Sequence, residues 1–255
     1  MGLRWRLRIR GKPSAAVISG HAEKLWYLRQ TRLFDRLNEA DLHRLAQSSE
    51  MREYTRGEVI LGPGPRSDAI YLVKAGRVKI STPSAGGKEQ VLALLDRGDL
   101  FGELAPQELP VPARAEALDR AVVCRIERTL FEDIIRSTPD VALKVIQALA
   151  RRLRAAEQEI EDLALRDVPG RLASLLLRLA DGYGEEDARG VRLSFRLTHQ
   201  DLADMIGSTR ETVTVIMTRF REDALINADQ RTLIILDREG LSTVAHPRRR
   251  ERHQG

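Results

Sequence analysis

The spacing of apolar residues divides the chain into a helical start, a β-rich middle and a helical second half. From His21 to about Gln47, leucines recur at helical spacing, and Asn38 is a suitable N-cap for a helix that starts near Glu39. From residue 52 to 128 the apolar runs are short and β-rich, and turns containing Gly or Pro separate them. This pattern predicts an antiparallel β-roll or barrel with flanking helices.

The run from Ala121 to Ile126 predicts the strand that closes the β-rich region. Val122, Cys124 and Ile126 occupy alternate positions and therefore face the same side. We interpret Cys124, the only cysteine, as a small core residue rather than a redox sensor. A single cysteine also argues against an intrachain disulfide and a cysteine-ligated zinc or iron–sulfur centre, and it suits a reducing cytoplasm.

A long helix is predicted from about Pro139 to Leu165. Its apolar residues alternate at spacings of three and four, as in a coiled-coil seam, and charged residues flank them. A helix that packs only on its own domain would show a broader apolar stripe. We therefore expect contact with a second copy of the chain; the alternative is an amphipathic helix lying on the roll. The seam consists of Ile146, Leu149, Leu153, Ala156, Ile160 and Leu163.

Asp167-Val-Pro-Gly ends this long helix and marks a hinge. A new helix is expected from Arg171 to Tyr183 because leucines recur in it at helical spacing. The stretch from Gly182 to Gly190 is polar and is expected to form a loop. We place the boundary between two domains near Asp167.

Residues 197–221 carry the strongest functional signal, that of a helix-turn-helix. Thr198 is a natural N-cap for a short first helix, and Gly207 supplies the positive φ of a sharp turn. Ser208 or Thr209 caps a second helix, which is apolar on one face. Two β runs around a polar turn follow, at 224–236, and predict a wing hairpin. The alternative is a helical hairpin that binds nothing.

The outward face of the second helix is predicted to read DNA. The early positions of this helix reach base edges in the major groove. Arg210 can pair with guanine, and Glu211 can accept a hydrogen bond from cytosine N4. The helix N-termini and nearby polar side chains can hold phosphates. The candidate DNA-binding residues are Thr198, His199, Gln200, Ser208, Thr209, Arg210, Glu211, Thr214 and Thr218.

These elements together predict an α+β chain with a winged helix-turn-helix. The expected divisions are a basic, flexible N-terminal tail at 1–20, a β-roll domain with flanking helices at 21–138, a dimerisation helix at 139–166, a DNA-binding domain at 167–240 and a basic C-terminal tail at 241–255. A purely structural dimerisation module is the alternative, but it would leave Arg210 and Glu211 without a role.

Charge and composition narrow the function classes further. The formal net charge is +5, and the excess of arginine lies at the two ends, which suits either solvated tails or non-specific phosphate contacts. No apolar run is long enough to cross a membrane, and the N-terminus lacks the apolar segment of a secretory signal. No nucleophile–base pair, metal-ligand spacing or phosphate-binding loop points to an enzyme.

Four segments resemble the CRP/FNR family of transcription regulators, and the resemblance covers about residues 30–240. The segment 207–213, Gly-Ser-Thr-Arg-Glu-Thr-Val, resembles the recognition-helix signature, and 99–104, Asp-Leu-Phe-Gly-Glu-Leu, resembles the start of the effector cassette. Segments 150–153 and 167–171 resemble the dimer helix and hinge. The resemblance implies a β-roll sensor and a homodimer on a palindromic promoter site. It also implies contact with RNA polymerase, with activation as the usual outcome.

Departures from the family pattern affect the expected effector. Gly102 and Glu103 of the cassette are present, but Val111 and Pro112 fall where cyclic-AMP-binding members keep an Arg-Ser pair for the phosphate. Arg114 is a nearby cation that could replace it. The hydroxyl pair that contacts adenine falls on Ala156 and Glu157 in the dimer helix. A phosphate without a cation binds poorly, so we expect the protein not to depend on cyclic AMP.

Other sensors of the family are also disfavoured. The iron–sulfur type needs several cysteines, and the five histidines are scattered, so no metal or haem site stands out. Two options are left: another small effector, such as the 2-oxoglutarate of related nitrogen regulators, or no ligand and control through abundance. We slightly favour the second, with no cofactor. Val215 stands where many members keep an arginine, so the preferred half-site is expected to differ.

Overall fold

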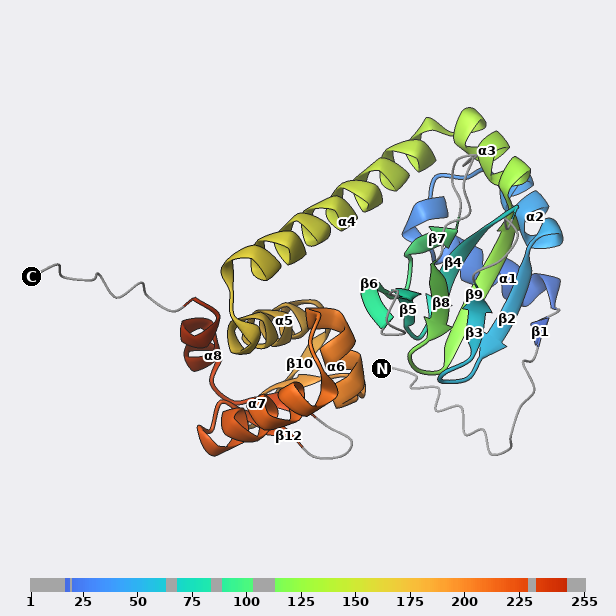
Figure 1. Cartoon of the computed structure of the whole chain (residues 1–255). Helices are drawn as coiled ribbons and strands as arrows, with labels where there is room; N and C mark the ends of the chain where they lie inside the picture. The colour runs from blue at the N-terminus through green and yellow to red at the C-terminus, as the bar shows by residue number, and fades with distance from the viewer. Residues whose placement is uncertain are drawn as a thin grey trace, which may run out of the picture.

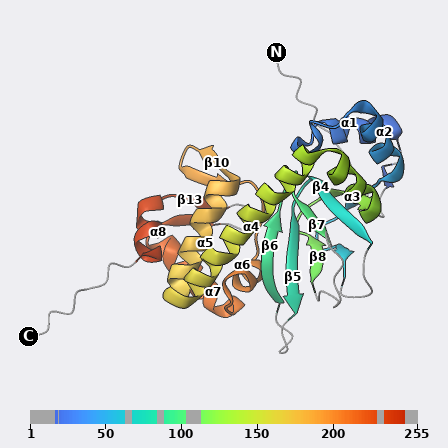
Figure 2. The same ribbon diagram turned by 90° about the horizontal axis from the view of Figure 1, so that it is seen from above.

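The computed structural model describes residues 17–18, 20–62, 68–83, 89–102, 113–228 and 233–246. A β-roll and a smaller, mainly helical domain lie on the same side of a long helix, α4 (Figure 1). Figure 2 shows α4 passing beside both domains, with α5 directly alongside its C-terminal part. This arrangement confirms the predicted α+β class. None of the described helices is long and apolar enough to cross a membrane.

Two antiparallel sheets face each other in the β-roll. Their inner faces enclose an apolar core that includes Tyr71, Val73, Ile80 and Phe101. The first sheet has the order β1 (Val17–Ile18), β2 (Glu50–Tyr54), β9 (Ala121–Glu127), β4 (Ala69–Ala75) and β7 (Leu100–Gly102). The second has the order β3 (Val59–Leu61), β8 (Arg114–Ala117), β5 (Val78–Pro83) and β6 (Glu89–Leu95). The pairing of β1 with β2 means that residues 17–18 belong to the roll, whereas we expected a flexible tail up to residue 20.

Helices pack on the outer face of the first sheet around Phe34, Leu45, Ile126 and Phe131. They are α1 (His21–Arg29), the 3₁₀ turn η1 (Arg32–Phe34), α2 (Glu39–Ser48) and α3 (Arg128–Ser137). The leucine spacing of residues 21–47 therefore comes from two helices and a turn, not from one run. The helical run is interrupted at Thr31, which is extended, and the turn after it places Leu33 and Phe34 in the core. Asn38 caps α2, since its side chain accepts from the Asp41 amide at 2.8 Å.

Cys124 lies in β9 between β2 and β4, opposite Met51 and Leu72. It has no exposed surface, and burial raises the pKa of its thiol to about 11. At pH 8 only about one thiol in a thousand would then be the reactive thiolate. The interpretation of Cys124 as a core residue is confirmed.

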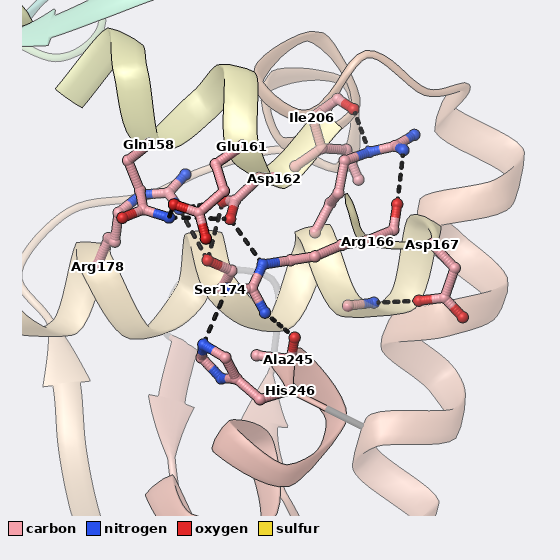
Figure 3. Close-up of polar contacts among 12 residues, drawn as sticks. Gln158, Glu161, Asp162, Arg166, Asp167, Ser174, Arg178, Ile206, Ala245 and His246 are labelled. Carbon is pink, nitrogen blue, oxygen red and sulfur yellow. Dashed lines mark hydrogen bonds and ion pairs between the residues drawn. The ribbon is translucent and has the colours of Figure 1, made fainter. Parts of the chain in front are cut away.

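The hinge joins α4 (Pro139–Leu165) to α5 (Val168–Tyr183). Asp167 caps α5 by accepting from the Gly170 amide at 2.9 Å. Asp162, near the end of α4, is almost fully buried and pairs with Arg166 at 2.7 Å and with Arg178 of α5 (Figure 3). Arg166 also donates to the carbonyl of Ala245, so one arginine connects the hinge to the C-terminal end of the described chain.

The C-terminal domain builds a small sheet and three helices on α5. Its sheet has the order β10 (Gly184–Asp187), β11 (Gly190–Leu193), β13 (Leu233–Ile235) and β12 (Ile226–Ala228). Its helices are α6 (His199–Ile206), α7 (Arg210–Glu222) and α8 (Arg238–Ala245).

Two predictions about this domain were wrong. The stretch 182–190, expected to be a loop, contains β10 and the start of β11, which form a hairpin. The tail expected at 241–255 is wrong for its first residues, because α8 extends to Ala245; residues 247–255 lie outside the described part of the chain. Leu241 and Ala245 are fully buried, so α8 is part of the domain core.

Candidate nucleic-acid interface

The two helices α6 and α7 form a helix-turn-helix with well-defined ends. Thr198 and Asp201 make a reciprocal capping box at the start of α6. Gly207 ends α6 with a φ of 62°, a left-handed conformation that glycine adopts without strain. Of the two expected caps for α7, it is Thr209 that accepts, from the Thr212 amide at 3.2 Å. The turn is therefore set by local sequence signals.

The inner faces of both helices hold the motif against α5. Leu202, Ala203 and Ile206 of α6 are buried in one core with Val213 and Phe220 of α7. Packing of this kind leaves only one face of α7 exposed to solvent. The orientation of α7 is thus fixed by apolar burial.

The outer face of α7 presents the predicted base-reading residues. Arg210, Glu211 and Thr214 are exposed, and Thr218 is half-buried. Among the described residues, neither Arg210 nor Glu211 forms an ion pair within 4 Å, whereas Arg219, further along the helix, pairs with Asp223 at 3.6 Å. The Thr214 and Thr218 hydroxyls donate to the carbonyls of Arg210 and Thr214, one turn earlier. Two free charges of opposite sign therefore stand at the N-terminus of α7.

His199 connects the first helix to this face. Its Nδ1 lies 2.8 Å from the Thr214 hydroxyl oxygen. Partial burial lowers the pKa of His199, and the positive charges of Arg221 and Arg210 lower it further. Gln200 is exposed beside it and donates to Asp204 at 2.7 Å, and Ser208 is half-exposed in the turn. The structure thus places His199 beside the exposed face of α7, whereas the Thr198 hydroxyl donates to Asp201, whose carboxylate contacts the β-roll. The hairpin of β12 and β13 confirms the predicted wing; its tip, 229–232, lies outside the described residues.

The opposite side of α6 docks on the β-roll, a contact that the sequence did not reveal. Lys79 of β5 is buried, and its Nζ lies 3.7 Å from Asp201 Oδ1 and 3.4 Å from Glu89. Arg56 reaches the other Asp201 oxygen at 3.3 Å. Arg77 donates to the Ser194 hydroxyl at 2.6 Å and lies over the Phe195 ring. No local pattern could have found these partners, because they come from distant parts of the chain.

The predicted effector residues do not form a recognisable anion site among the described residues. Arg114 Nη2 lies 2.8 Å from Glu116, and its Nη1 lies 3.8 Å from Glu89, so carboxylates already neutralise its charge. Gly102 has a φ of 102°, and a Cβ there would lie 2.7 Å from the Ala69 carbonyl oxygen. This glycine is explained by backbone packing. Glu103, Val111 and Pro112 lie outside the described residues. No group of three or more possible metal ligands occurs in the described part of the chain.

Most of the predicted seam of α4 has no covering element in the described chain, although Leu163 at its end lies close to Gly207. Leu153 is 61 % exposed and Ile160 is 66 % exposed. Ile146, Leu149, Ala156 and Leu163 are exposed as well. The other face of α4 is held by Val141 and Val145 in the core of the roll. The helix therefore has one face on its own domain and a second apolar face open to solvent.

Comparison with known proteins gives the same division of the chain. Residues 51–138 match the family model of the cyclic nucleotide-binding domain, and residues 170–244 match that of the Crp-like helix-turn-helix domain. The global nitrogen regulator of Synechocystis sp. is 32 % identical over 195 residues, covering 74 % of this chain and 85 % of that protein. The chain belongs to the CRP/FNR family.

Two further CRP/FNR-type relatives illustrate the range of the family. The CRP-like cAMP-activated global transcriptional regulator of Mycobacterium tuberculosis is 27 % identical over 216 residues, covering 84 % of this chain and 96 % of that protein. A solved CRP/FNR-family transcriptional regulator from Thermus thermophilus superposes with a TM-score of 0.62 at 30 % identity, covering 76 % of this chain and 97 % of that one. The chain is therefore a transcription regulator of the CRP/FNR type with a helix-turn-helix DNA-binding domain.

Proposed function

We propose that this regulator acts as a homodimer that reads a palindromic promoter site with the N-terminal half of α7. The observation that carries the proposal is the pair of Arg210 and Glu211, which are exposed at the first turn of α7 without an ion-pair partner among the described residues. An arginine at that place can donate two hydrogen bonds to guanine, and a glutamate can accept from cytosine.

The remaining residues of the set position the protein on the backbone. The free amides at the N-terminus of α6, with Thr198, His199 and Gln200, favour phosphate contacts. Ser208 and Thr209 do the same at the start of α7. Thr214 and Thr218 extend the face of α7 along the groove. Phosphate contacts fix the register, whereas Arg210 and Glu211 supply the base specificity.

The dimer is proposed to form along the apolar seam of α4. The seam consists of Ile146, Leu149, Leu153, Ala156, Ile160 and Leu163, and a second copy of the same helix offers the complementary surface. A twofold axis along α4 would place two copies of α7 for the two half-sites of a palindrome. Contact with RNA polymerase and an activating role in the cytoplasm are proposed on family grounds alone.

DNA binding is proposed to be independent of cyclic AMP. Arg114, the one cation expected near the cassette phosphate position, is already paired with Glu116. Release of this arginine to bind a phosphate would break its ion pairs with Glu116 and Glu89 and leave Lys79 to neutralise both carboxylates. Ala156 and Glu157 lack the hydroxyls that would receive adenine. We propose no catalytic activity and no resident cofactor.

Selection of a duplex from a random library, followed by fluorescence anisotropy at fixed salt, tests this proposal. The selected site is expected to be palindromic and to bind at least about 10³-fold more tightly than a scrambled duplex, with or without cyclic AMP. DNA binding that appears only with cyclic AMP, or only with 2-oxoglutarate, would show instead that the regulator depends on that effector. Equal affinity for both duplexes would refute specific recognition.

A further inference from the structure

An open cavity of about 840 Å³ lies between the β-roll and the hinge helices; it reaches the first cassette residue, Asp99, but Gly102 and Arg114 do not line it. Its walls come from the segment after α1, the turn between β6 and β7, and the helices α4 and α5. In Figure 1, α5 lies beneath α4 on the side where the roll is found. A molecule in this cavity would therefore touch the sensor domain and the first helix of the DNA-binding domain at once.

Four arginines line this cavity: Arg32, Arg97, Arg151 and Arg178. Only Arg178 forms an ion pair within the described residues, with Asp162. Arg97 donates to the Gln30 amide oxygen at 3.4 Å, a long bond to a neutral group. Arg32, Arg97 and Arg151 are exposed. Three guanidinium groups without carboxylate partners in the described chain thus converge on one cavity.

The acidic residues of the cavity do not cancel this charge. Asp96 and Asp99 also line it, but they belong to one turn, in which Asp99 accepts from the Asp96 amide at 3.0 Å. Burial and the neighbouring Asp99 raise the pKa of Asp96. Because Arg178 is paired with Asp162, two carboxylates face three arginines without an ion pair in the described chain, which still leaves the cavity with an excess of positive charge and of N–H donors. Arginine is the side chain best suited to bidentate hydrogen bonds with phosphate oxygens.

The expected dimer would leave this cavity accessible from the α4 side. Arg151 is two residues from Leu149 and from Leu153, and two residues correspond to about 200° around an α-helix. Arg151 therefore points away from the seam formed by those leucines. The partner copy on the seam and an occupant of the cavity would lie on opposite sides of α4.

We propose that this cavity binds a small polyanion with two or more phosphate groups, held by Arg97 and Arg151 across the gap between the roll and α4. Arg32 and Arg178 complete the positive lining, and Tyr183 forms part of the wall. Because the occupant bridges the roll and α5, it stabilises the docked arrangement of the two domains. Binding at this site would change the affinity for DNA, and DNA would change the affinity of this site by the same factor. This consequence rests on the proposed function.

Titration calorimetry with inorganic tripolyphosphate, without DNA and at constant ionic strength, tests the site. We expect saturable binding with one tripolyphosphate per chain. Arg97→Gln and Arg151→Gln should each weaken it by roughly tenfold, the loss expected for one charge-assisted contact. Arg154→Gln, an exposed arginine of the same helix outside the cavity, should leave the affinity unchanged, as should Arg114→Gln in the cassette region.

The controls separate the site from general attraction to a basic protein. Non-saturable binding, or equal weakening in Arg97→Gln and Arg154→Gln, would overturn the proposal. Loss of binding in Arg114→Gln alone would place the anion in the cassette and would also overturn it. An unchanged melting temperature of each variant shows that a loss of tripolyphosphate binding does not come from misfolding. Because no DNA is present, failure here does not bear on the proposed function.

Discussion

The Nζ atom of Lys79 in the β-roll lies 3.7 Å from Oδ1 of Asp201, the residue that forms the capping box of α6. The same ammonium lies 3.4 Å from Glu89 and 4.0 Å from Glu116. One buried lysine therefore neutralises carboxylates of both domains. With the contacts of Arg56 and Arg77 and the packing of Val91 and Leu118 on the same core, this contact holds the helix-turn-helix against the roll.

Replacement of Lys79 by methionine is expected to destabilise the docked arrangement. Three carboxylates would be left without their shared cation, at a cost of about 2–3 kcal/mol, below that of a fully buried pair because Glu89 is 32 % exposed. Chemical denaturation measures the loss, and hydrogen exchange should rise at α6. Arg56→Gln removes a more exposed partner of Asp201 and should cost less than about 1 kcal/mol. Equal costs in both variants would contradict the central role of Lys79.

Asp162→Asn is expected to weaken the hinge. Burial by itself would raise the pKa of Asp162, but hydrogen bonds from Arg166, Arg178 and Ser174 lower it overall. Loss of the charge should cost about 2–3 kcal/mol of unfolding free energy, moderated because Arg178 is 38 % exposed. The exposed neighbour Glu161, changed to Gln, should cost less than about 0.5 kcal/mol.

The pH dependence of this contribution follows from the lowered pKa. The unfolded chain binds a proton at Asp162 more readily than the folded chain does, so the stabilisation is complete above the ordinary value of 3.8 and is lost as the pH falls through the folded-state value. Acid denaturation of the wild type and of Asp162→Asn should therefore converge at low pH. A gap that stays constant down to pH 2 would argue against the assigned pKa direction.

His199 is expected to titrate below its ordinary value of 6.5 because burial and two arginines disfavour its charged form. Proton NMR of the imidazole, assigned with His199→Gln, measures this pKa directly. Arg221→Gln should raise the pKa of His199 by removing one of the two positive charges that lower it. Since the unfolded chain takes up this proton more readily, the contribution of His199 to stability is present above about pH 6.5 and declines on acidification. A pKa at or above 6.5 would be inconsistent with this environment.

Leu153→Glu is expected to convert the dimer to a monomer, since it places a charge in the middle of the apolar seam of α4. Sedimentation at micromolar concentration should show half the wild-type mass, and affinity for a palindromic duplex should fall accordingly. Leu165→Glu introduces the same charge on the same helix outside the seam, at a residue that is 76 % exposed, and should leave the mass unchanged. An unchanged mass in Leu153→Glu would remove the seam from the dimer.

The sequence predicted the helix-turn-helix well because its signals are local. The caps at Thr198 and Thr209 and the left-handed Gly207 all act within one or two turns of chain. The first strand of the hairpin, β10, was missed because its sequence, Gly-Glu-Glu-Asp, is polar and mostly exposed, so it shows no alternation of apolar residues. The docking of Lys79 on Asp201 depends on how the domains meet, and no pattern along the chain contains that information.

The most direct test of base reading by α7 compares Arg210→Ala with Arg219→Ala, which lies on the same helix but is paired with Asp223. Anisotropy is measured at fixed salt on a selected palindrome and on its single-position variants. Arg210→Ala is expected to lose about 1–3 kcal/mol of specific binding and to relax the preference at one position of each half-site, while binding to random DNA changes little. Arg219→Ala should retain the preference. Equal losses on specific and random DNA in Arg210→Ala would contradict direct reading of bases by this helix.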